Sequence, residues 1–330
     1  MKNFVKKITP NVIKRDIKRV IWVSNNPFLF ASQNSLFNRF VQQFIKPKGP
    51  PILLISLPRG GSSWIGDTLG RSSLALYLRE PITQSYIREI GAGPSFFEYE
   101  KCKDKSRYKR FTSDAFQGIP SFNSSIITYP KQWLFCDRIK KRIVIKEVNP
   151  LVLRMVLEKY HPRVVYLLRH PVPVAHSFFV QGWVGDQYQG RYSDESLNRF
   201  RLKYGNYEQG SFWEQMGSLQ AIAQNETLET LSKYSDHTVI QYENFCVQPL
   251  QQFRKLFEFC ELPFSNELAE HIENSTSSSE KYVTGEYSLA RDSKNMLDRW
   301  KFEVSKEHIS QLRKSYLANT PKYYADNSQW

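Results

Sequence analysis

The sequence predicts one large α/β domain, and three observations lead to this prediction. Short apolar runs of strand length recur along the chain, and stretches with helical spacing of apolar residues lie between them. One of these runs passes through a glycine-rich turn into a helical pattern, as at a strand-to-helix junction. The chain has 330 residues, of which 41% are hydrophobic, so it is long and apolar enough to bury a sizeable core.

The first segment, residues 1–50, is strongly basic. The formal net charge of the chain is +14, and this segment carries ten lysines and arginines against one acidic residue, Asp16. Its apolar residues recur at helical spacing, so we expect a basic helical segment ahead of a domain at 51–330. A helix packed on the domain and a helix lying on an anionic membrane surface both fit this pattern. Because the excess charge is local, no nucleic-acid partner is predicted.

The sequence contains neither an apolar run of the roughly 20 residues that span a bilayer nor a secretory cleavage pattern. Its four cysteines, Cys102, Cys136, Cys246 and Cys260, form no C-x-x-C pair and no dense disulfide pattern, which suits a reducing compartment. We therefore expect a cytoplasmic protein, with peripheral membrane contact through residues 1–50 left open. None of the six histidines has a second ligand at metal-binding spacing, so no metal site is predicted.

The most informative stretch is PPILLISLPRGGSSWIG, residues 50–66. The apolar run Ile52–Leu57 predicts a buried strand, which breaks at Pro58 and Arg59 and continues as a helical pattern. Backbone N–H groups and the positive end of a helix dipole converge at such a turn. The stretch therefore predicts a site for an anion, and above all for a phosphate.

The residues of this turn differ from those of an ATP- or GTP-binding loop. Gly60 and Gly61 allow the backbone to approach a ligand, and Ser62 and Ser63 add hydroxyl donors. A loop for ATP or GTP has a lysine directly before the serine or threonine whose hydroxyl is held for magnesium. Here no lysine precedes the serines, and the cation is Arg59, ahead of the glycines.

The next two predicted strands both end beside a glutamate. Leu74–Leu78 is followed by Glu80, and a proline after it limits helix continuation. Arg142–Ile145 ends in Lys146 and Glu147. Because α/β sheets place their ligands at strand ends, these charged residues are candidates for a functional site. Between the two strands, residues with poor periodicity predict an insertion over the active face.

A second strong motif is RVVYLLRHPVPVAHS, residues 163–177. Val164–Leu168 predicts a fully buried strand, Arg169 stands at its carboxyl end, and the prolines begin a helix that carries Ser177. This pattern places a guanidinium and a hydroxyl at the mouth of the sheet, where they are suited to clamping one phosphate. A further buried strand, Thr238–Gln241, leads into an amphipathic helix near 250–260.

These motifs resemble those of sulfotransferases that use 3′-phosphoadenosine-5′-phosphosulfate (PAPS). The order Pro-Arg-Gly-Gly-Ser-Ser-Trp-Ile-Gly-Asp from Pro58 resembles their phosphosulfate-binding loop and is nearest to the carbohydrate-type branch. Those enzymes commonly carry serine where this chain has Gly60, a departure expected to matter little because the position offers backbone. Arg169 and Ser177 match the segment that binds the 3′-phosphate. The resemblance covers about Ile52 to Leu312 and implies a single α/β domain of P-loop NTPase-like fold, with a central parallel sheet flanked by helices.

The resemblance also implies a role for each candidate residue. Lys146 and Arg59 would stabilise the charge that develops in the reaction, and either Glu80 or Glu147 would take the proton of the acceptor hydroxyl. Val148 stands where the cytosolic small-molecule branch has its catalytic histidine, which excludes histidine catalysis by that route. The residues implied to bind PAPS are Arg59, Gly60, Gly61, Ser62, Ser63, Trp64, Arg169, Ser177, Arg291 and Lys294. Trp64 would pack on adenine, Arg291 and Lys294 would complete the 3′-phosphate site, and Trp300 would be a core residue.

The function implied is transfer of a sulfuryl group from PAPS to a hydroxyl of a carbohydrate or glycolipid-like acceptor, without a metal and with 3′-phosphoadenosine-5′-phosphate (PAP) as product. The insertion at 91–137 would lie on the acceptor side. Four aromatic residues are candidates to line the acceptor site, namely Phe96, Phe97, Trp183 and Tyr188. The alternative is a kinase-like or regulatory nucleotide-binding protein that shares the P-loop architecture, and its ATP binding would depend on magnesium.

Overall fold

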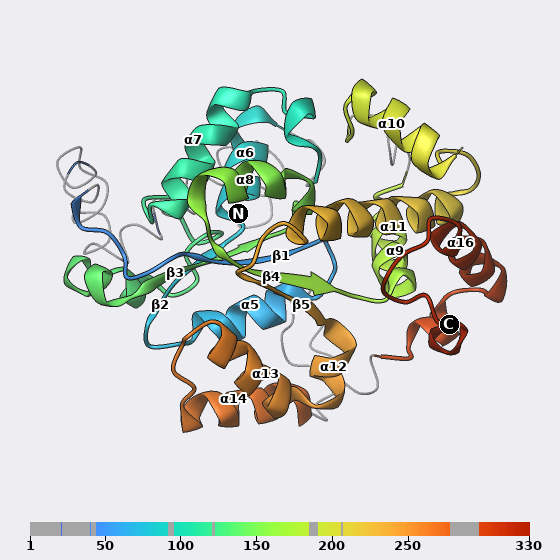
Figure 1. Ribbon diagram of the computed structural model, residues 1–330. Helices are drawn as coiled ribbons and strands as arrows, with labels where there is room; N and C mark the ends of the chain where they lie inside the picture. Colours follow the sequence, from blue (N-terminus) through green and yellow to red (C-terminus); the bar gives the residue numbers. More distant parts are fainter. Residues whose placement is uncertain are drawn as a thin grey trace, which may run out of the picture.

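A five-stranded parallel sheet forms the centre of the structure, a computed structural model that describes residues 44–91, 96–120, 123–184, 191–205, 207–277 and 297–330, with Ile21 and Phe40 (Figure 1). Among these residues the strand order is β2-β3-β1-β4-β5, and each neighbouring pair is parallel. The strands are β1 (Ile52–Ser56), β2 (Ala75–Arg79), β3 (Arg142–Glu147), β4 (Arg163–Leu168) and β5 (His237–Gln241). The predicted fold class is confirmed, and each strand begins and ends within two residues of its expected bounds.

Helices cover both faces of the sheet (Figure 1). Helices α5, α12, α13 and α14 pack on one face, and α6, α7, α8, α9 and α11 pack on the other. The helices are α5 (Ser62–Gly70), α6 (Pro81–Ile90), α7 (Lys105–Phe116), α8 (Leu153–Tyr160), α9 (Pro171–Val180), α10 (Asp194–Tyr204), α11 (Phe212–Leu231), α12 (Tyr242–Val247), α13 (Pro249–Phe259), α14 (Asn266–Ser277), α15 (Trp300–Glu303) and α16 (Lys306–Ala318).

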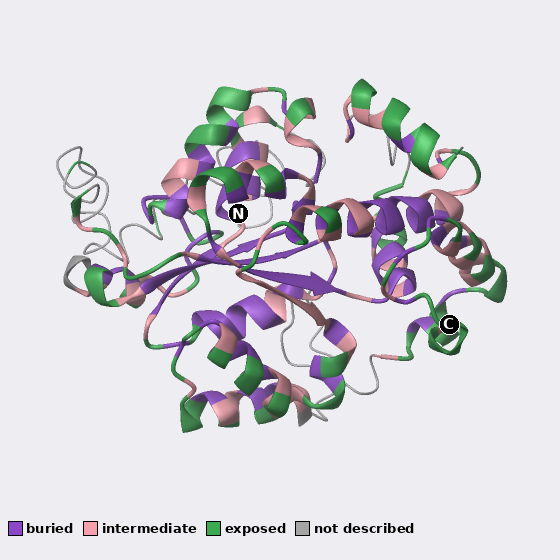
Figure 2. Cartoon of the chain, viewed as in Figure 1, coloured by how far each residue is buried: buried purple, intermediate pink, exposed green. Residues whose placement is uncertain are grey.

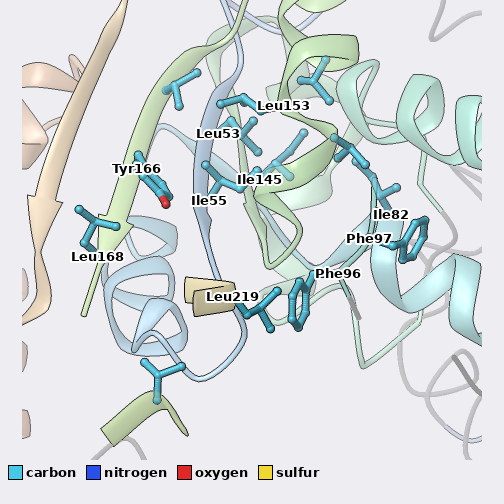
Figure 3. Packing of buried hydrophobic residues seen from close by; sticks show 14 of the residues in the cluster. Leu53, Ile55, Ile82, Phe96, Phe97, Ile145, Leu153, Tyr166, Leu168 and Leu219 are labelled. Carbon is cyan, nitrogen blue, oxygen red and sulfur yellow. The ribbon is translucent and has the colours of Figure 1, made fainter. Parts of the chain in front are cut away.

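Burial on both faces explains why the strands read as continuous apolar runs. Ile52 and Leu54 pack toward α5 and α13, whereas Leu53 and Ile55 pack toward α6 and α11. Figure 3 shows Leu53 and Ile55 beside Ile145 of the neighbouring strand, and Figure 2 shows β1 to β4 buried along most of their length. The edge strand β5, which the sequence predicts to be buried, is only half-buried. Successive side chains on a strand point to opposite faces. The same alternation governs the charged residues at the strand ends.

The strand order brings the candidate residues together at the carboxyl ends of the strands. Strand β1 lies between β3 and β4, and the chain crosses to opposite sides of β1 to form them. The carboxyl ends beside such a switch point are where open α/β sheets bind ligands. The glycine-rich turn follows β1, Lys146 and Glu147 end β3, and Arg169 follows β4.

One part of the chain differs from the sequence-based expectation, and for another the expectation is not tested. The insertion at 91–137, expected to lack periodicity, contains helix α7, whose face bearing Tyr108, Phe111 and Phe116 is buried. Most of the basic segment at 1–50 lies outside the described residues. No helix in the described ranges combines the length and the apolar character needed to cross a membrane.

Candidate active site

The turn after β1 is built so that its backbone faces a ligand. Arg59 and Gly61 both have positive φ, 66° and 89°, and helix α5 begins at Ser62. The N–H of Gly60 donates to the carbonyl of Leu57 at 3.1 Å, which tightens the turn. The first N–H groups of a helix have no partner within it, so those of α5 are oriented to bind an anion.

The two glycines of the turn are required for different reasons. A Cβ on Gly61 would overlap the ring of Tyr242, and its φ of 89° is strained for any other residue. A Cβ on Gly60 would lie 3.0 Å from the carbonyl oxygen of Leu57. A serine at position 60 is therefore tight in this chain, so glycine there is more than a neutral replacement.

Gly61→Ala is expected to destabilise the fold by about 3 kcal/mol, because the strain of a positive φ adds to the overlap with Tyr242. Gly182→Ala is the matched control, since Gly182 also has a positive φ, 67°, but a Cβ at that position would meet no atom within 4 Å among the described residues. Urea unfolding of both variants measures the difference. Equal losses of stability in the two variants would show that the Tyr242 contact is unimportant.

Three of the predicted anion-binding side chains meet beside the turn. The Nε of Arg59 donates to the Oγ of Ser177 at 2.6 Å, and an Nη1 of Arg169 donates to the carbonyl oxygen of Arg59 at 3.1 Å. The guanidinium of Arg169 also lies over the ring of Tyr242, 4.7 Å from its centre. The strand end, the turn and helix α9 therefore place two guanidinium groups and one hydroxyl together.

Lys146 and Glu80 form an ion pair at the ends of β3 and β2. The Nζ of Lys146, a residue only 2% exposed, binds the Oε1 of Glu80, and the Nε2 of Gln84 donates to Oε2 at 2.9 Å. Burial raises the pKa of Glu80, but the charge and hydrogen bond of Lys146 and the hydrogen bond of Gln84 outweigh it and lower that pKa below its usual value. Glu80 is thus ionised at neutral pH.

Glu147 projects to the opposite face from Lys146 and binds the start of helix α6. Its Oε1 accepts from the N–H groups of Ile82 at 2.7 Å and Thr83 at 3.2 Å, and its Oε2 accepts from the hydroxyl of Thr83 at 2.6 Å. Burial, together with the charge of Glu80, raises the pKa of Glu147 to about 7 against these hydrogen bonds. The two candidate bases therefore have different surroundings.

Glu147→Gln is expected to flatten the pH dependence of stability. The folded pKa of about 7 lies above the value of about 4.3 for a free glutamate, so the folded protein holds a proton that the unfolded chain releases. The stability that protonation of Glu147 contributes is complete at pH values below the unfolded pKa. It is lost as the pH rises through the folded pKa, and the free energy of unfolding then falls by up to about 1.4 kcal/mol per pH unit. Urea unfolding across this range checks the slope, and an identical slope in the variant would contradict the assignment.

Trp64 lies on the α13 side of the sheet. Its ring packs edge-on against Tyr242 at 6.0 Å and Phe253 at 5.2 Å, and its Nε1 donates to the Oγ of Ser275 at 3.4 Å. Tyr242 contacts Trp64, Gly61 and Arg169, yet no motif in the sequence marked it as a site residue. Its position directly after β5 is the signal that would have identified it, because the other site residues also follow strands.

Other candidates lie in the core or outside the described residues. Phe96 and Phe97 are buried, where Phe96 packs against Phe178 and Phe97 against Tyr108, so both are core residues, and their place at the acceptor site stays a prediction. Trp183 is partly exposed. Trp300 is buried, as predicted. Arg291, Lys294 and Tyr188 lie outside the described residues, and among the residues that are described no group of three or more His, Cys, Asp or Glu side chains could hold a metal ion.

Comparison with known proteins identifies the family. The model of the sulfotransferase domain matches residues 49–322. The chain belongs to the sulfotransferase family. The predicted enzyme class is thereby confirmed, and the match includes both the glycine-rich turn and the Arg169 segment. A search of curated proteins finds no match to this sulfotransferase.

Several solved structures are similar to this sulfotransferase. The sulfotransferase domain from the curacin biosynthetic pathway is 17% identical with a TM-score of 0.43, over 81% of this chain and 98% of that one. Mouse sulfotransferase SULT7A1, solved in complex with PAP, is 12% identical with a TM-score of 0.43, over 90% and 93%. Sulfotransferase STF1 from Mycobacterium tuberculosis H37Rv is 14% identical with a TM-score of 0.43, over 82% and 80%.

Proposed function

We propose that this sulfotransferase transfers a sulfuryl group from PAPS to a hydroxyl of a carbohydrate or glycolipid acceptor. The observation that carries the donor assignment is the meeting of Arg59, Arg169 and Ser177 beside the glycine-rich turn. PAPS has a phosphosulfate at one end and a phosphate on its ribose, so it needs two adjoining anion sites. The turn supplies backbone N–H groups for one, and the guanidinium and hydroxyl groups supply the other.

The residues that fit the phosphosulfate are those of the turn. Gly61 and the first residues of α5 offer backbone N–H groups, Gly60 lets the backbone come close, and Ser62 and Ser63 offer hydroxyls. Arg169 and Ser177 fit the 3′-phosphate, because a guanidinium binds two phosphate oxygens at once. Arg59, which the family resemblance assigns to the reacting end, is proposed here to assist them because its side chain binds Ser177. When bound, PAPS supplies the sulfuryl group and a phosphate as leaving group. The protein contributes position and charge, as in phosphoryl transfer.

Glu80 is the better candidate for the general base. Both oxygens of Glu147 accept hydrogen bonds from the start of α6, whereas Glu80 lies on the Lys146 side of the strand ends, held by one ammonium and one amide. Glu80 would take the proton of the acceptor hydroxyl as the hydroxyl oxygen bonds to sulfur. Lys146 would neutralise the bridging oxygen as the bond between it and sulfur breaks. If Lys146 turns from Glu80 toward that oxygen, the pKa of Glu80 rises, which favours proton transfer.

The acceptor class is proposed from the likeness of the turn and of Glu80-Pro81 to carbohydrate-type sulfotransferases. A sulfotransferase implies a hydroxyl-bearing acceptor, and the insertion at 91–137 is proposed to lie on its side of the site. We further propose a cytoplasmic location, supported by the buried free thiols of Cys102, Cys246 and Cys260. Residues 1–50 are proposed to pack on the domain, with contact to an anionic membrane through their basic charge as the alternative.

Transfer of sulfur-35 from labelled PAPS tests the proposed function. The purified full chain is incubated with glycans, glycolipids, phenols and steroid alcohols, and labelled products are identified by mass. Label on a sugar hydroxyl supports the proposal, and label on phenols or steroids alone would reject the acceptor class. Binding of ATP that depends on magnesium, without binding of PAP, would reject the donor and favour the kinase-like alternative.

A further inference from the structure

The last residues of the chain fold back onto the carboxyl end of β4. His170, which directly follows Arg169, has its ring stacked on Trp300, with centres 4.7 Å apart and planes at 14°. The ring of Trp330 meets the same imidazole edge-on at 4.7 Å and 62°. Figure 1 shows the C-terminus beside α16, on the α9 and α11 side of the sheet. The neighbour of the phosphate-binding arginine is thus packed between two tryptophans.

The carboxylate of Glu243 joins His170 to the C-terminal residues. The backbone N–H of His170 donates to the Oε1 of Glu243 at 2.9 Å, and the hydroxyl of Tyr324 donates to Oε2 at 2.6 Å. The Nε1 of Trp330 donates to the carbonyl of Tyr324 at 3.1 Å. Tyr324 is buried, so its hydroxyl has little access to water as a replacement partner. Both oxygens of Glu243 are therefore used to hold the backbone after β4 against the end of the chain.

The same residues are fixed to the helical layer. The N–H of Tyr323 donates to the Oε1 of Gln224 in α11 at 3.0 Å, and the hydroxyl of Tyr316 in α16 donates to the carbonyl of Tyr323 at 2.8 Å. The Nε2 of Gln224 donates in turn to the hydroxyl of Tyr316 at 2.8 Å. The C-terminal residues therefore link helices α11 and α16 to the end of β4.

The ring contacts that Trp300 and Trp330 make with His170 do not depend on its charge. Burial lowers the pKa of His170 to about 3, so the ring is neutral at physiological pH and is no phosphate ligand as an imidazolium. The residue that carries charge here is Arg169, whose guanidinium is held over Tyr242 and against the carbonyl of Arg59. Its side chain is thus positioned by the turn, and its backbone by the His170 contacts.

We propose that residues 323–330, which lie beyond the range matched by the family model, position Arg169 for the 3′-phosphate of the donor, with Tyr324 and Trp330 as the positioning residues. This inference rests on the proposed use of PAPS. The residues touch no reacting atom. Tyr324 and Trp330 act through Glu243 and His170. They raise the affinity only for ligands that carry a 3′-phosphate.

The test compares the affinities for PAP and for AMP, which lacks the 3′-phosphate, in Tyr324→Phe and Trp330→Ala variants of the full chain. Tyr324→Phe removes one hydroxyl and leaves the ring. Each change is expected to raise the Kd for PAP about tenfold and to leave the Kd for AMP within about twofold, since the loss concerns the geometry of one arginine. In turnover, the KM for PAPS should rise while kcat stays unchanged. Trp330→Phe should restore most of the PAP affinity.

Ser328→Ala is the matched control within the segment, because Ser328 is exposed and its N–H and hydroxyl both donate to the nearby Asp326 at 2.8 Å. It should leave both affinities unchanged. Thermal unfolding without ligand separates positioning from a general loss of structure. Equal weakening of PAP and AMP, or a lower melting temperature with unchanged PAP affinity, would overturn the inference and leave the proposed function intact. Failure of the unaltered protein to bind PAP would overturn both.

Discussion

Arg169→Ala is expected to weaken PAP binding about 100-fold, because the two charge-assisted hydrogen bonds that we propose Arg169 makes to the 3′-phosphate would be lost together. Arg169 stands at the carboxyl end of β4, against the turn that follows β1. AMP has no 3′-phosphate, so its affinity should change far less. Isothermal titration of both nucleotides measures the two effects.

Arg163→Ala is the matched control, since Arg163 begins the same strand and binds Asp236 and Glu261 at the amino ends of the strands. This variant should lose some stability and keep its affinity for PAP. If Arg163→Ala and Arg169→Ala weaken PAP binding equally, the strand end is no phosphate site. If neither does, the donor binds elsewhere.

Glu80→Gln is expected to lower kcat about 1,000-fold while PAP affinity stays within about threefold, because glutamine keeps the shape of the side chain but accepts no proton. The sign of the pH effect follows from the lowered pKa of Glu80. The base is active above its pKa, and activity is lost as the pH falls through a value below the usual range for glutamate. The acid limb of the kcat/KM profile, which reports the free enzyme, should disappear in the variant.

Glu147→Gln separates the two carboxylates, which the sequence left as alternatives. It should change stability more than kcat, since Glu147 binds the start of α6. A larger loss of kcat in Glu147→Gln than in Glu80→Gln would assign the base to Glu147. Single-turnover kinetics with saturating PAPS measure the chemical step in both variants.

The parts of the fold that are local in sequence could be predicted. Parallel strands buried on both faces read as continuous apolar runs, so β1, β2, β3 and β4 could be predicted from these runs. Strand β5 was predicted at the right place, but its expected burial is wrong, because this edge strand is only half-buried along its length. Arg169 and Ser177 were also found, because a strand end and the helix after it fix both side chains within a few residues. Family resemblance then suggested the 3′-phosphate as the anion for them, which stays a prediction.

What depends on contacts between distant segments could not be predicted. The alternation along β3 shows that Lys146 and Glu147 diverge, but only the folded structure shows that Glu147 binds the start of α6 and Glu80 pairs with Lys146. The apolar face of α7 was hidden among lysines and arginines. The contacts of Tyr324 with Glu243 and of Trp330 with His170 join residues far apart in the chain, and no pattern in the sequence marks them.

A crystal structure of the full chain with PAP is the most direct test of the central claim, which is that one donor molecule is bound at both ends. We expect the 5′-phosphate on the N–H groups of Gly61 to Ser63, and the 3′-phosphate against the guanidinium of Arg169 and the hydroxyl of Ser177. A 3′-phosphate that points into solvent, or a nucleotide bound away from the carboxyl ends of β1 and β4, would contradict it.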